Sequence, residues 1–134
     1  MKKFDLSMEF LYWYFDAKVI GRKQDQLWQF WYNTDYEAGI FIKKKDVFKY
    51  VNNFKLGAGT DIEKHAKKIA DIVLTENFGK IDVELFSDGE TNIREGFHTI
   101  AAYEYLGIMN IPVVSEQKDF ILKDYDKFIN NNVV

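Results

Sequence analysis

The sequence contains no cysteine and only one proline among its 134 residues. The absence of cysteine excludes disulfide bonds, thiolate metal sites and cysteine nucleophiles. It also fits a reducing compartment, so we expect a cytoplasmic protein. The single proline is Pro112. Because proline has no backbone N–H to donate, it predicts the start of a strand or an edge strand at residues 111–114.

Long apolar runs and an excess of positive charge are also missing. Two lysines near the N-terminus precede Asp5 and Glu9, and no uninterrupted apolar stretch follows that would serve as a signal peptide or a membrane span. The formal net charge is -3, which does not indicate a strongly basic nucleic-acid binder. With 47% hydrophobic and 29% charged residues, the composition is globular. We therefore expect one soluble domain, residues 1–134, with no membrane partner.

The clearest elements lie after residue 59. Thr60 and Glu63 have the spacing of a helical capping box, and an amphipathic pattern then continues to about residue 75. Residues 80–86 alternate apolar and acidic side chains, which predicts a half-buried strand, and residues 87–90 predict a tight turn into a returning strand at 91–94. A helix is predicted at 97–106, ending at Gly107, followed by a strand at 111–114 and a helix at 119–130.

The first 56 residues are rich in aromatic side chains and less regular. Residues 8–20 are apolar without a clean period, which fits a short helix and a buried strand equally well. Residues 27–32 and 39–43 predict two strands around a turn at 33–35. Asp46 then begins a predicted helix that runs to about residue 52. The glycine-containing stretch 52–59 predicts a loop, and it is the favoured hinge of the chain.

A run of motifs in the second half resembles a known family. The stretch Ile93-Arg94-Glu95-Gly96-Phe97-His98-Thr99-Ile100-Ala101-Ala102 precedes Tyr105-Leu106-Gly107-Ile108 and Ile111-Pro112-Val113. This order is similar to the ParB/sulfiredoxin-like superfamily, whose pattern is an acidic residue, glycine, any residue, histidine and arginine, then an alanine-rich helix ending in Leu-Gly and an Ile-Pro-Val strand. The resemblance covers residues 60–115. It implies an α/β (α+β) fold with a ParB-like core, an aromatic-rich N-terminal part at 1–56 and a C-terminal helix at 119–130.

The resemblance also implies a phosphate site at the corner formed by residues 95–99. Its implied catalytic residues are His98 and Glu95, and its implied ligand-binding residues are Arg94, Gly96, Phe97 and Thr99. The family's arginine after the histidine is Thr99 here. Arginine grips phosphate through two parallel N–H bonds, whereas threonine offers one hydroxyl, so the replacement argues against turnover. Arg94 is a candidate substitute, and the sulfiredoxin branch is excluded because there is no cysteine.

Other charged residues have simpler interpretations. Four carboxylates near the predicted hairpin have the oxygen chemistry that Mg²⁺ prefers, but such residues more often form a solvated strand face and turn, so we predict no metal site: Asp82, Glu84, Asp88 and Glu90. A second acidic and histidine-containing group, Asp61, Glu63 and His65, fits helix capping and solvent exposure.

The aromatic residues between positions 12 and 36 have three interpretations, which we rank. They form a core first, a protein-partner surface second, and a stacking surface for nucleic-acid bases third. The partner surface would use Trp28, Trp31 and Tyr32. The stacking surface would take its positive charge from Lys43, Lys44, Lys45 and Lys49.

Two functional hypotheses result from the sequence. The first is a ParB-like domain that binds a nucleotide, with Mg²⁺ as its accompanying ion, or a nucleic-acid backbone at the Glu95–Thr99 corner. If such a domain is an enzyme, its reaction is phosphoryl transfer or phosphodiester cleavage. The second is a catalytically inactive protein-binding module, for example a phage or mobile-element accessory protein that inhibits a host nuclease or defence system.

Overall fold

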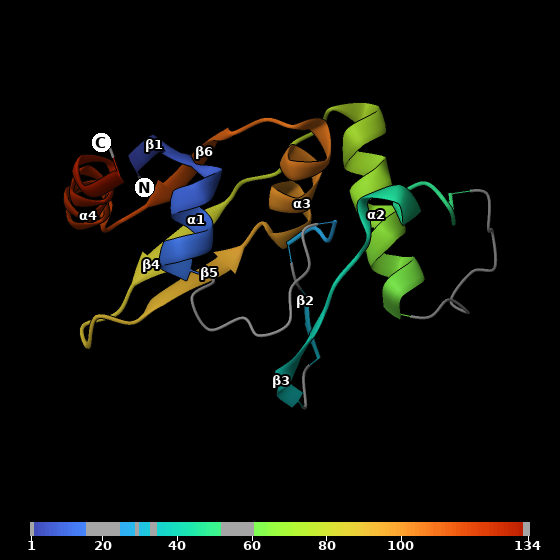
Figure 1. Ribbon diagram of the computed structural model, residues 1–134, viewed down its shortest axis with the longest axis horizontal. Helices are drawn as coiled ribbons and strands as arrows, with labels where there is room; N and C mark the ends of the chain where they lie inside the picture. Colours follow the sequence, from blue (N-terminus) through green and yellow to red (C-terminus); the bar gives the residue numbers. More distant parts are fainter. Residues whose placement is uncertain (1, 16–24, 29, 33–34, 52–60, 133–134) are drawn as a thin grey trace. The chain divides into compact units, whose positions relative to one another are not determined.

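The computed structural model describes residues 2–15, 25–28, 30–32, 35–51 and 61–132. It contains both helices and strands, as the sequence predicted (Figure 1). The chain contacts divide it into two units. The sheet unit comprises residues 1–18, 80–96 and 109–134, and the helical unit comprises residues 19–79 and 97–108. The predicted single domain over residues 1–134 stays a prediction.

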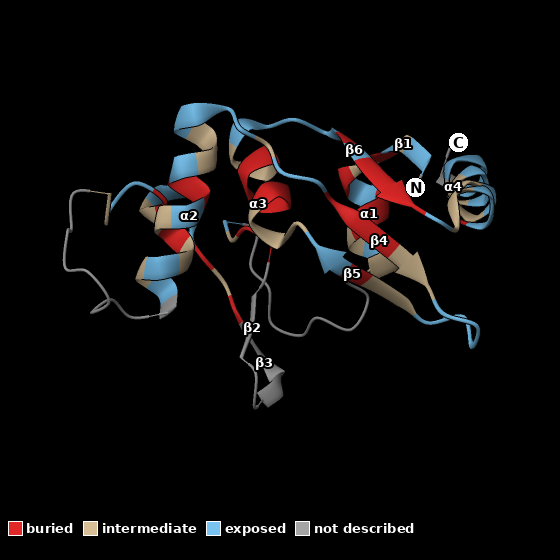
Figure 2. Cartoon of the chain, turned by 180° about the vertical axis from the view of Figure 1, so that it is seen from behind, coloured by how far each residue is buried: buried red, intermediate tan, exposed pale blue. Residues whose placement is uncertain are grey.

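The sheet unit is built on four strands in the order β1-β6-β4-β5. β1 (Lys2–Ser7) pairs antiparallel with β6 (Asn110–Ser115) along its whole length. β6 pairs parallel with β4 (Asp82–Leu85), which forms an antiparallel hairpin with β5 (Thr91–Glu95). The sheet is therefore mixed. The buried apolar side chains on β4, β5 and β6 are Val83, Ile93, Ile111, Val113 and Val114. Figure 2 shows buried stretches of these strands in red.

Two helices of the sheet unit share one aromatic core. α1 (Met8–Phe15) begins where the Ser7 hydroxyl accepts a hydrogen bond from the Phe10 N–H at 3.2 Å, the geometry of an N-cap. Phe10 is fully buried, and its ring lies 4.9 Å from Tyr125 and 5.4 Å from Phe128 of α4 (Lys118–Asn132). The ambiguous apolar run at 8–20 is thus helical at residues 8–15. Aromatic contacts of this kind fix the packing of α1 on α4.

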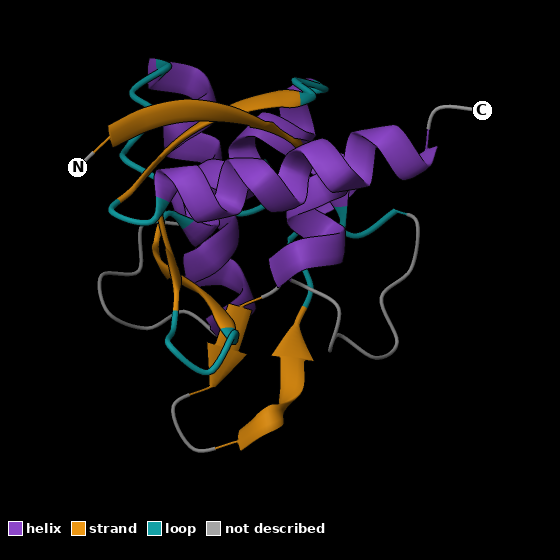
Figure 3. Ribbon diagram, turned by 90° about the vertical axis from the view of Figure 1, so that its left-hand side faces the viewer, coloured by secondary structure: helices purple, strands orange, loops and turns teal. Residues whose placement is uncertain are grey.

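The helical unit contains a short hairpin, a 3-10 turn and two helices. β2 (Phe30–Tyr32) pairs antiparallel with β3 (Asp35–Ile40), and both are drawn as orange arrows in Figure 3. The turn η1 (Lys44–Asp46) follows, and α2 (Asp61–Thr75) packs against α3 (Phe97–Leu106). The buried side chains of this unit include Trp28, Ile42, Val47, Ala66, Ile69 and Ile100.

The predicted helices and strands after residue 60 are confirmed, with small shifts of their ends. α2, α3 and α4 match the helices predicted at 60–75, 97–106 and 119–130. Gly107 has a φ of 73°, the left-handed conformation expected of a glycine that ends a helix. The hairpin of β4 and β5 is also confirmed. The capping position Thr60, the predicted loop 52–59 and most of the predicted turn at 33–35 lie outside the described residues.

Several local predictions are wrong. No strand was predicted at the N-terminus, where β1 lies. The helix predicted from Asp46 to about residue 52 is wrong over its described part, residues 46–51. This part is a series of tight turns, because the Lys49 and Val51 amides donate to carbonyls three residues back rather than four. The second strand of the hairpin covers 35–40, not 39–43.

The strand that contains Pro112 is also corrected. β6 is an internal strand, not an edge strand. Its one recorded pairing with β4 joins Val114 to Asp82, two residues after Pro112, so that pairing does not use the proline. The predicted solvent-facing side of β4 is half correct. Asp82 is only 6% exposed, although the alternation of the strand placed it on the polar face.

Candidate functional site

The strand side of the predicted corner belongs to the sheet unit and ends at Gly96. Gly96 has a φ of 112°, which side chains rarely tolerate. A Cβ atom at this position would lie 2.8 Å from the Ile81 Cα and 3.0 Å from the Lys80 carbonyl oxygen. The glycine therefore lets two chain segments of the sheet unit approach each other. This packing explains Gly96 without a ligand.

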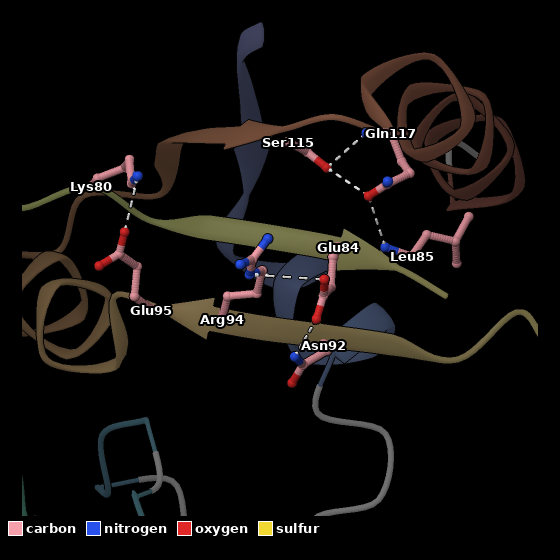
Figure 4. Close-up of polar contacts among 8 residues, drawn as sticks. All are labelled: Lys80, Glu84, Leu85, Asn92, Arg94, Glu95, Ser115 and Gln117. Carbon is pink, nitrogen blue, oxygen red and sulfur yellow. Dashed lines mark hydrogen bonds and ion pairs between the residues drawn. The ribbon is translucent and has the colours of Figure 1, made fainter. Parts of the chain in front are cut away.

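Arg94 lies at a bulge in β5, next to Gly96. Val83 pairs with Ile93 and Asp82 pairs with Glu95, so Arg94 is the extra residue between them. Its Nε lies 3.9 Å from the Glu84 carboxylate, which also accepts a 2.7 Å hydrogen bond from the Asn92 amide (Figure 4). The predicted substitute for the arginine clamp is thus turned toward a carboxylate of its own hairpin.

Glu95, the predicted second catalytic residue, has a partner within the same unit. Its carboxylate lies 3.1 Å from the Lys80 ammonium, and both side chains are about half exposed (Figure 4). An exposed ion pair of this kind contributes little to stability, about 0–1 kcal/mol. The contact explains the position of Glu95 by local charge pairing.

The helix side of the corner belongs to the helical unit. Phe97, His98 and Thr99 form the first turn of α3, where the backbone N–H groups have no partner within the helix. Phe97 and His98 are half-buried, and Thr99 is buried. The Thr99 hydroxyl lies 3.4 Å from the point that a Cβ of Gly79 would occupy. It therefore packs against the chain segment that follows α2.

His98 is hydrogen-bonded to the only other histidine of the chain. Its Nε2 lies 2.8 Å from Nδ1 of His65 on α2, and the two rings stack with centroids 5.0 Å apart. One ring donates its N–H and the other accepts it, and the tautomers decide which. From the sequence pattern, His65 was predicted to be a solvent-exposed residue in a helix cap. That interpretation is wrong, because His65 is half-buried and faces His98.

The pKa of His98 is lowered from 6.5 to about 4. Burial has the largest effect on this pKa, and the positive groups His65 and Lys68 add to it. At neutral pH His98 is therefore an uncharged imidazole, which can accept or donate a hydrogen bond. Of the two positive groups, the Lys68 ammonium would also attract an anion. We name these three residues, His65, Lys68 and His98, the histidine corner.

The contact between the two histidines was not predicted from the sequence. His98 belongs to the family motif, whereas His65 lies 33 residues earlier on a helix whose charged residues looked like a solvated face. A helical wheel separates His65 from the apolar stripe only weakly. The usable signal was that the chain has just two histidines, each on an element of the same predicted core.

The carboxylates of the hairpin serve local structure. Glu84 accepts from Asn92, and the Asp88 carboxylate accepts a 3.0 Å hydrogen bond from the Glu90 N–H in the turn. In the described part of the chain, no three histidine, aspartate or glutamate side chains gather in a way that would hold a metal ion. The same residues include no helix long and apolar enough to cross a membrane.

The predicted protein-partner residues are only partly described. Trp28 is 1% exposed and its backbone N–H donates to Glu104 of α3 at 2.5 Å, so it belongs to the core of the helical unit. The prediction of a partner contact through Trp28 is therefore wrong. Trp31 and Tyr32 form part of β2, and their side chains lie outside the described residues.

Comparisons with protein-family models, with curated proteins and with solved structures gave no match to this chain. The ParB/sulfiredoxin-like resemblance therefore stays a prediction from motifs.

Proposed function

We propose that this chain is a ParB/sulfiredoxin-like domain that binds a phosphate-containing ligand at the start of α3. The ligand class is a nucleotide or a nucleic-acid backbone, and the proposal concerns binding rather than turnover. The observation that carries it is the histidine corner, where His65, Lys68 and His98 converge beside the first turn of a ten-residue helix. Helix N-termini favour anions because their free N–H groups and the helix dipole both attract negative charge.

The lowered pKa of His98 supports an anionic ligand. Burial and two positive neighbours make protonation of His98 unfavourable in the unliganded protein. A phosphate group placed beside the ring would reverse the effect of those neighbours and raise this pKa. Binding at mildly acidic pH is therefore expected to take up a proton onto His98.

The residues of the helical unit have separate roles in this proposal. The N–H groups of the α3 first turn bind phosphate oxygens, His98 donates a hydrogen bond, and Lys68 supplies charge. His65 orients His98 through the 2.8 Å hydrogen bond. Arg94 and Glu95 are left out, because each already faces an oppositely charged side chain of the sheet unit.

Calorimetric titration tests this proposal. Wild-type protein is titrated with nucleoside triphosphates, with and without Mg²⁺, and with inorganic phosphate, at about pH 6 in two buffers of different ionisation enthalpy. We expect binding with proton uptake in wild type. His98→Ala should weaken it about tenfold or more and abolish the proton uptake, whereas His98→Gln should restore part of the affinity without the uptake.

The matched control is Lys64→Ala, an exposed residue beside His65 on α2. It should leave the affinity within about twofold of wild type, since Lys64 is not part of the histidine corner. Absence of binding by any nucleotide or by phosphate would refute the proposal. Equal losses in His98→Ala and Lys64→Ala would show that binding is non-specific charge attraction.

The second hypothesis, a protein-binding module, is favoured by one observation on α1. Trp13 is 55% exposed, and its ring lies 5.4 Å from Phe128 of α4. Exposed tryptophan is enriched among the residues that dominate protein interfaces. A partner recovered from host lysate should be lost with Trp13→Ala and kept with Phe86→Ala, which alters another exposed ring of the sheet unit. Equal recovery with both variants would exclude Trp13 as the contact.

A further inference from the structure

The tight turn after β3 presents an unusual concentration of positive charge. Residues 43–49 contain four lysines and one aspartate in a chain whose formal net charge is -3. All four lysine side chains are exposed: Lys43, Lys44, Lys45 and Lys49. We name these four residues, together with Phe48, the lysine turn.

A buried side chain and backbone hydrogen bonds hold the backbone of the lysine turn in place. Val47 is fully buried, and the Lys44 N–H donates to the Asp25 carbonyl at 3.1 Å. Within the turn, the Asp46 N–H donates to the Lys43 carbonyl at 2.9 Å and the Lys49 N–H donates to the Asp46 carbonyl at 3.1 Å. A charged surface on a fixed backbone loses little backbone entropy when it binds a partner.

Aromatic rings lie among the lysines. Phe48 is 36% exposed and meets the ring of Tyr105 edge-on at 5.4 Å. The Lys44 ammonium lies 5.7 Å from the centre of the Tyr105 ring, and the Lys49 ammonium lies 5.6 Å from that of Tyr50. Lysines would contact phosphates, and an exposed ring offers a face on which a base can stack.

We propose that the lysine turn is a binding surface for single-stranded nucleic acid, with phosphates on the lysines and a base stacked on Phe48. The lysine turn shares no residue with the histidine corner, although it contacts Tyr105 of the same helix α3, and it does not rest on the function proposed for that corner. Asp46, which is half-buried, lies within the turn, and Asp25 is joined to it by the hydrogen bond from the Lys44 N–H. These two acids reduce the positive charge without cancelling it.

Salt dependence follows from the number of lysines. Each lysine that neutralises a phosphate releases counterions, with a slope of about -0.7 per phosphate contact on single strands. Four contacts give a slope near -2.8, so affinity should fall about fiftyfold between roughly 50 and 200 mM salt. Replacing two lysines by glutamine should reduce the slope to about -1.4.

The experiment measures fluorescence anisotropy of a labelled oligothymidylate of about twenty nucleotides at several salt concentrations. The test variant is Lys43→Gln/Lys45→Gln, for which no ring contact is recorded among the described residues. The matched control is Lys123→Gln/Lys127→Gln, two exposed lysines of α4, which changes the net charge equally. At about 50 mM salt the test variant should bind about tenfold or more weakly, and the control should stay within about twofold of wild type.

Phe48→Ala tests the stacking contact separately. It should reduce affinity about five- to tenfold and leave the salt slope unchanged, because it removes no charge. Unchanged thermal midpoints would show that the variants are folded. A loss of affinity with a smaller slope in the lysine variant, together with a loss at constant slope in Phe48→Ala, supports the proposal.

Four results would overturn the proposal. They are no binding of the oligonucleotide at low salt, equal weakening by both lysine pairs, tighter binding of a duplex or of polyglutamate, and loss of oligonucleotide binding in His98→Ala with retention in the lysine variant. The last result would assign nucleic acid to the histidine corner instead. Conversely, oligonucleotide binding that survives in His98→Ala would support the lysine turn even if the nucleotide titration fails.

Discussion

The two sides of the 95–99 corner differ in what holds their side chains. On the strand side, Arg94 faces Glu84 and Glu95 faces Lys80, both within the sheet unit. On the helix side, His98 is hydrogen-bonded to a second histidine, His65, and the pKa of His98 is lowered to about 4. The strand-side groups therefore pair as opposite charges, whereas the helix-side pair is a hydrogen bond between two imidazole rings. For this reason the proposed ligand site uses the helix side, whereas the contacts of Arg94 and Glu95 are explained by the fold.

Glycine positions give the largest expected effect on the strand side. Gly96→Ala should destabilise the protein by about 3 kcal/mol or more, because the added Cβ meets backbone atoms of Lys80 and Ile81 in addition to the unfavourable φ. Gly89→Ala is the matched control, since Gly89 has a φ of 86° but no atom within 4 Å of the added carbon. It should cost about 1 kcal/mol. Urea unfolding measures both, and equal losses would show that φ strain alone governs Gly96.

A buried carboxylate gives the next largest effect, on the helical unit. Burial raises the pKa of Glu104 from 4.5 to about 8, and the hydrogen bond from the Trp28 N–H opposes that rise. Between these two pKa values the unfolded chain has lost the proton and the folded chain keeps it. Stability should therefore fall as pH rises from about 4.5 to 8. The full shift corresponds to about 5 kcal/mol, and because Glu104 is not fully buried we expect on the order of 3 kcal/mol in total.

Glu104→Gln isolates this dependence. Glutamine keeps an oxygen that can accept from the Trp28 N–H but has no proton to lose. The variant should be more stable than wild type at about pH 8 and close to it at about pH 4, as measured by thermal unfolding across this range. If the thermal stabilities of wild type and variant change equally with pH, the pKa of Glu104 is not raised in the folded protein.

The histidine pair gives a smaller pH dependence of opposite sign. Because the pKa of His98 is lowered in the folded state, its contribution is complete above about pH 6.5 and is lost as pH falls toward 4. Solvent screening reduces the effect to roughly 1–2 kcal/mol. His98→Gln should remove this loss of stability at acidic pH, as measured by urea unfolding at about pH 7 and pH 4.5. If His98→Gln loses as much stability as wild type between these two pH values, the lowered pKa of His98 is not the cause of the loss.

The fold was predictable where periodic patterns were long. α2 and α3 each show a helical pattern, and Gly107 marks the end of α3. β1 was missed although Phe4 and Leu6 alternate with Asp5 and Ser7, because an alternation with only two apolar residues is too short to indicate a strand by itself. Its strand conformation comes from pairing with β6, a partner more than a hundred residues away. The tight turns after Asp46 were read as a helix because Val47, Phe48 and Val51 have helical spacing, although β-branched and aromatic residues favour helices weakly.

The site was predictable only in part, for a related reason. The motif placed His98 and Gly96 at the end of β5 and the start of α3, and both lie there. His65 could not be assigned to the pair, because its position relative to His98 depends on how α2 packs on α3. The burial of Trp28 likewise depends on packing within the helical unit. Local patterns predict elements, but contacts between elements require their arrangement in space.

The smallest expected effect tests whether the strand side takes part in binding at all. Arg94→Gln removes an ion pair whose atoms are 3.9 Å apart and whose arginine is 57% exposed, so unfolding free energy should change by less than about 0.5 kcal/mol. Nucleotide affinity should also stay within about twofold, because the guanidinium faces Glu84. The same calorimetric titration measures it, with Glu84→Gln as the reciprocal control. The Glu84→Gln variant removes the carboxylate that Arg94 faces, and we expect it not to raise the affinity for nucleotides. If affinity does rise in Glu84→Gln and falls about tenfold in Arg94→Gln, then Arg94 takes part in phosphate binding and the restriction of the proposed ligand to the helix side is wrong.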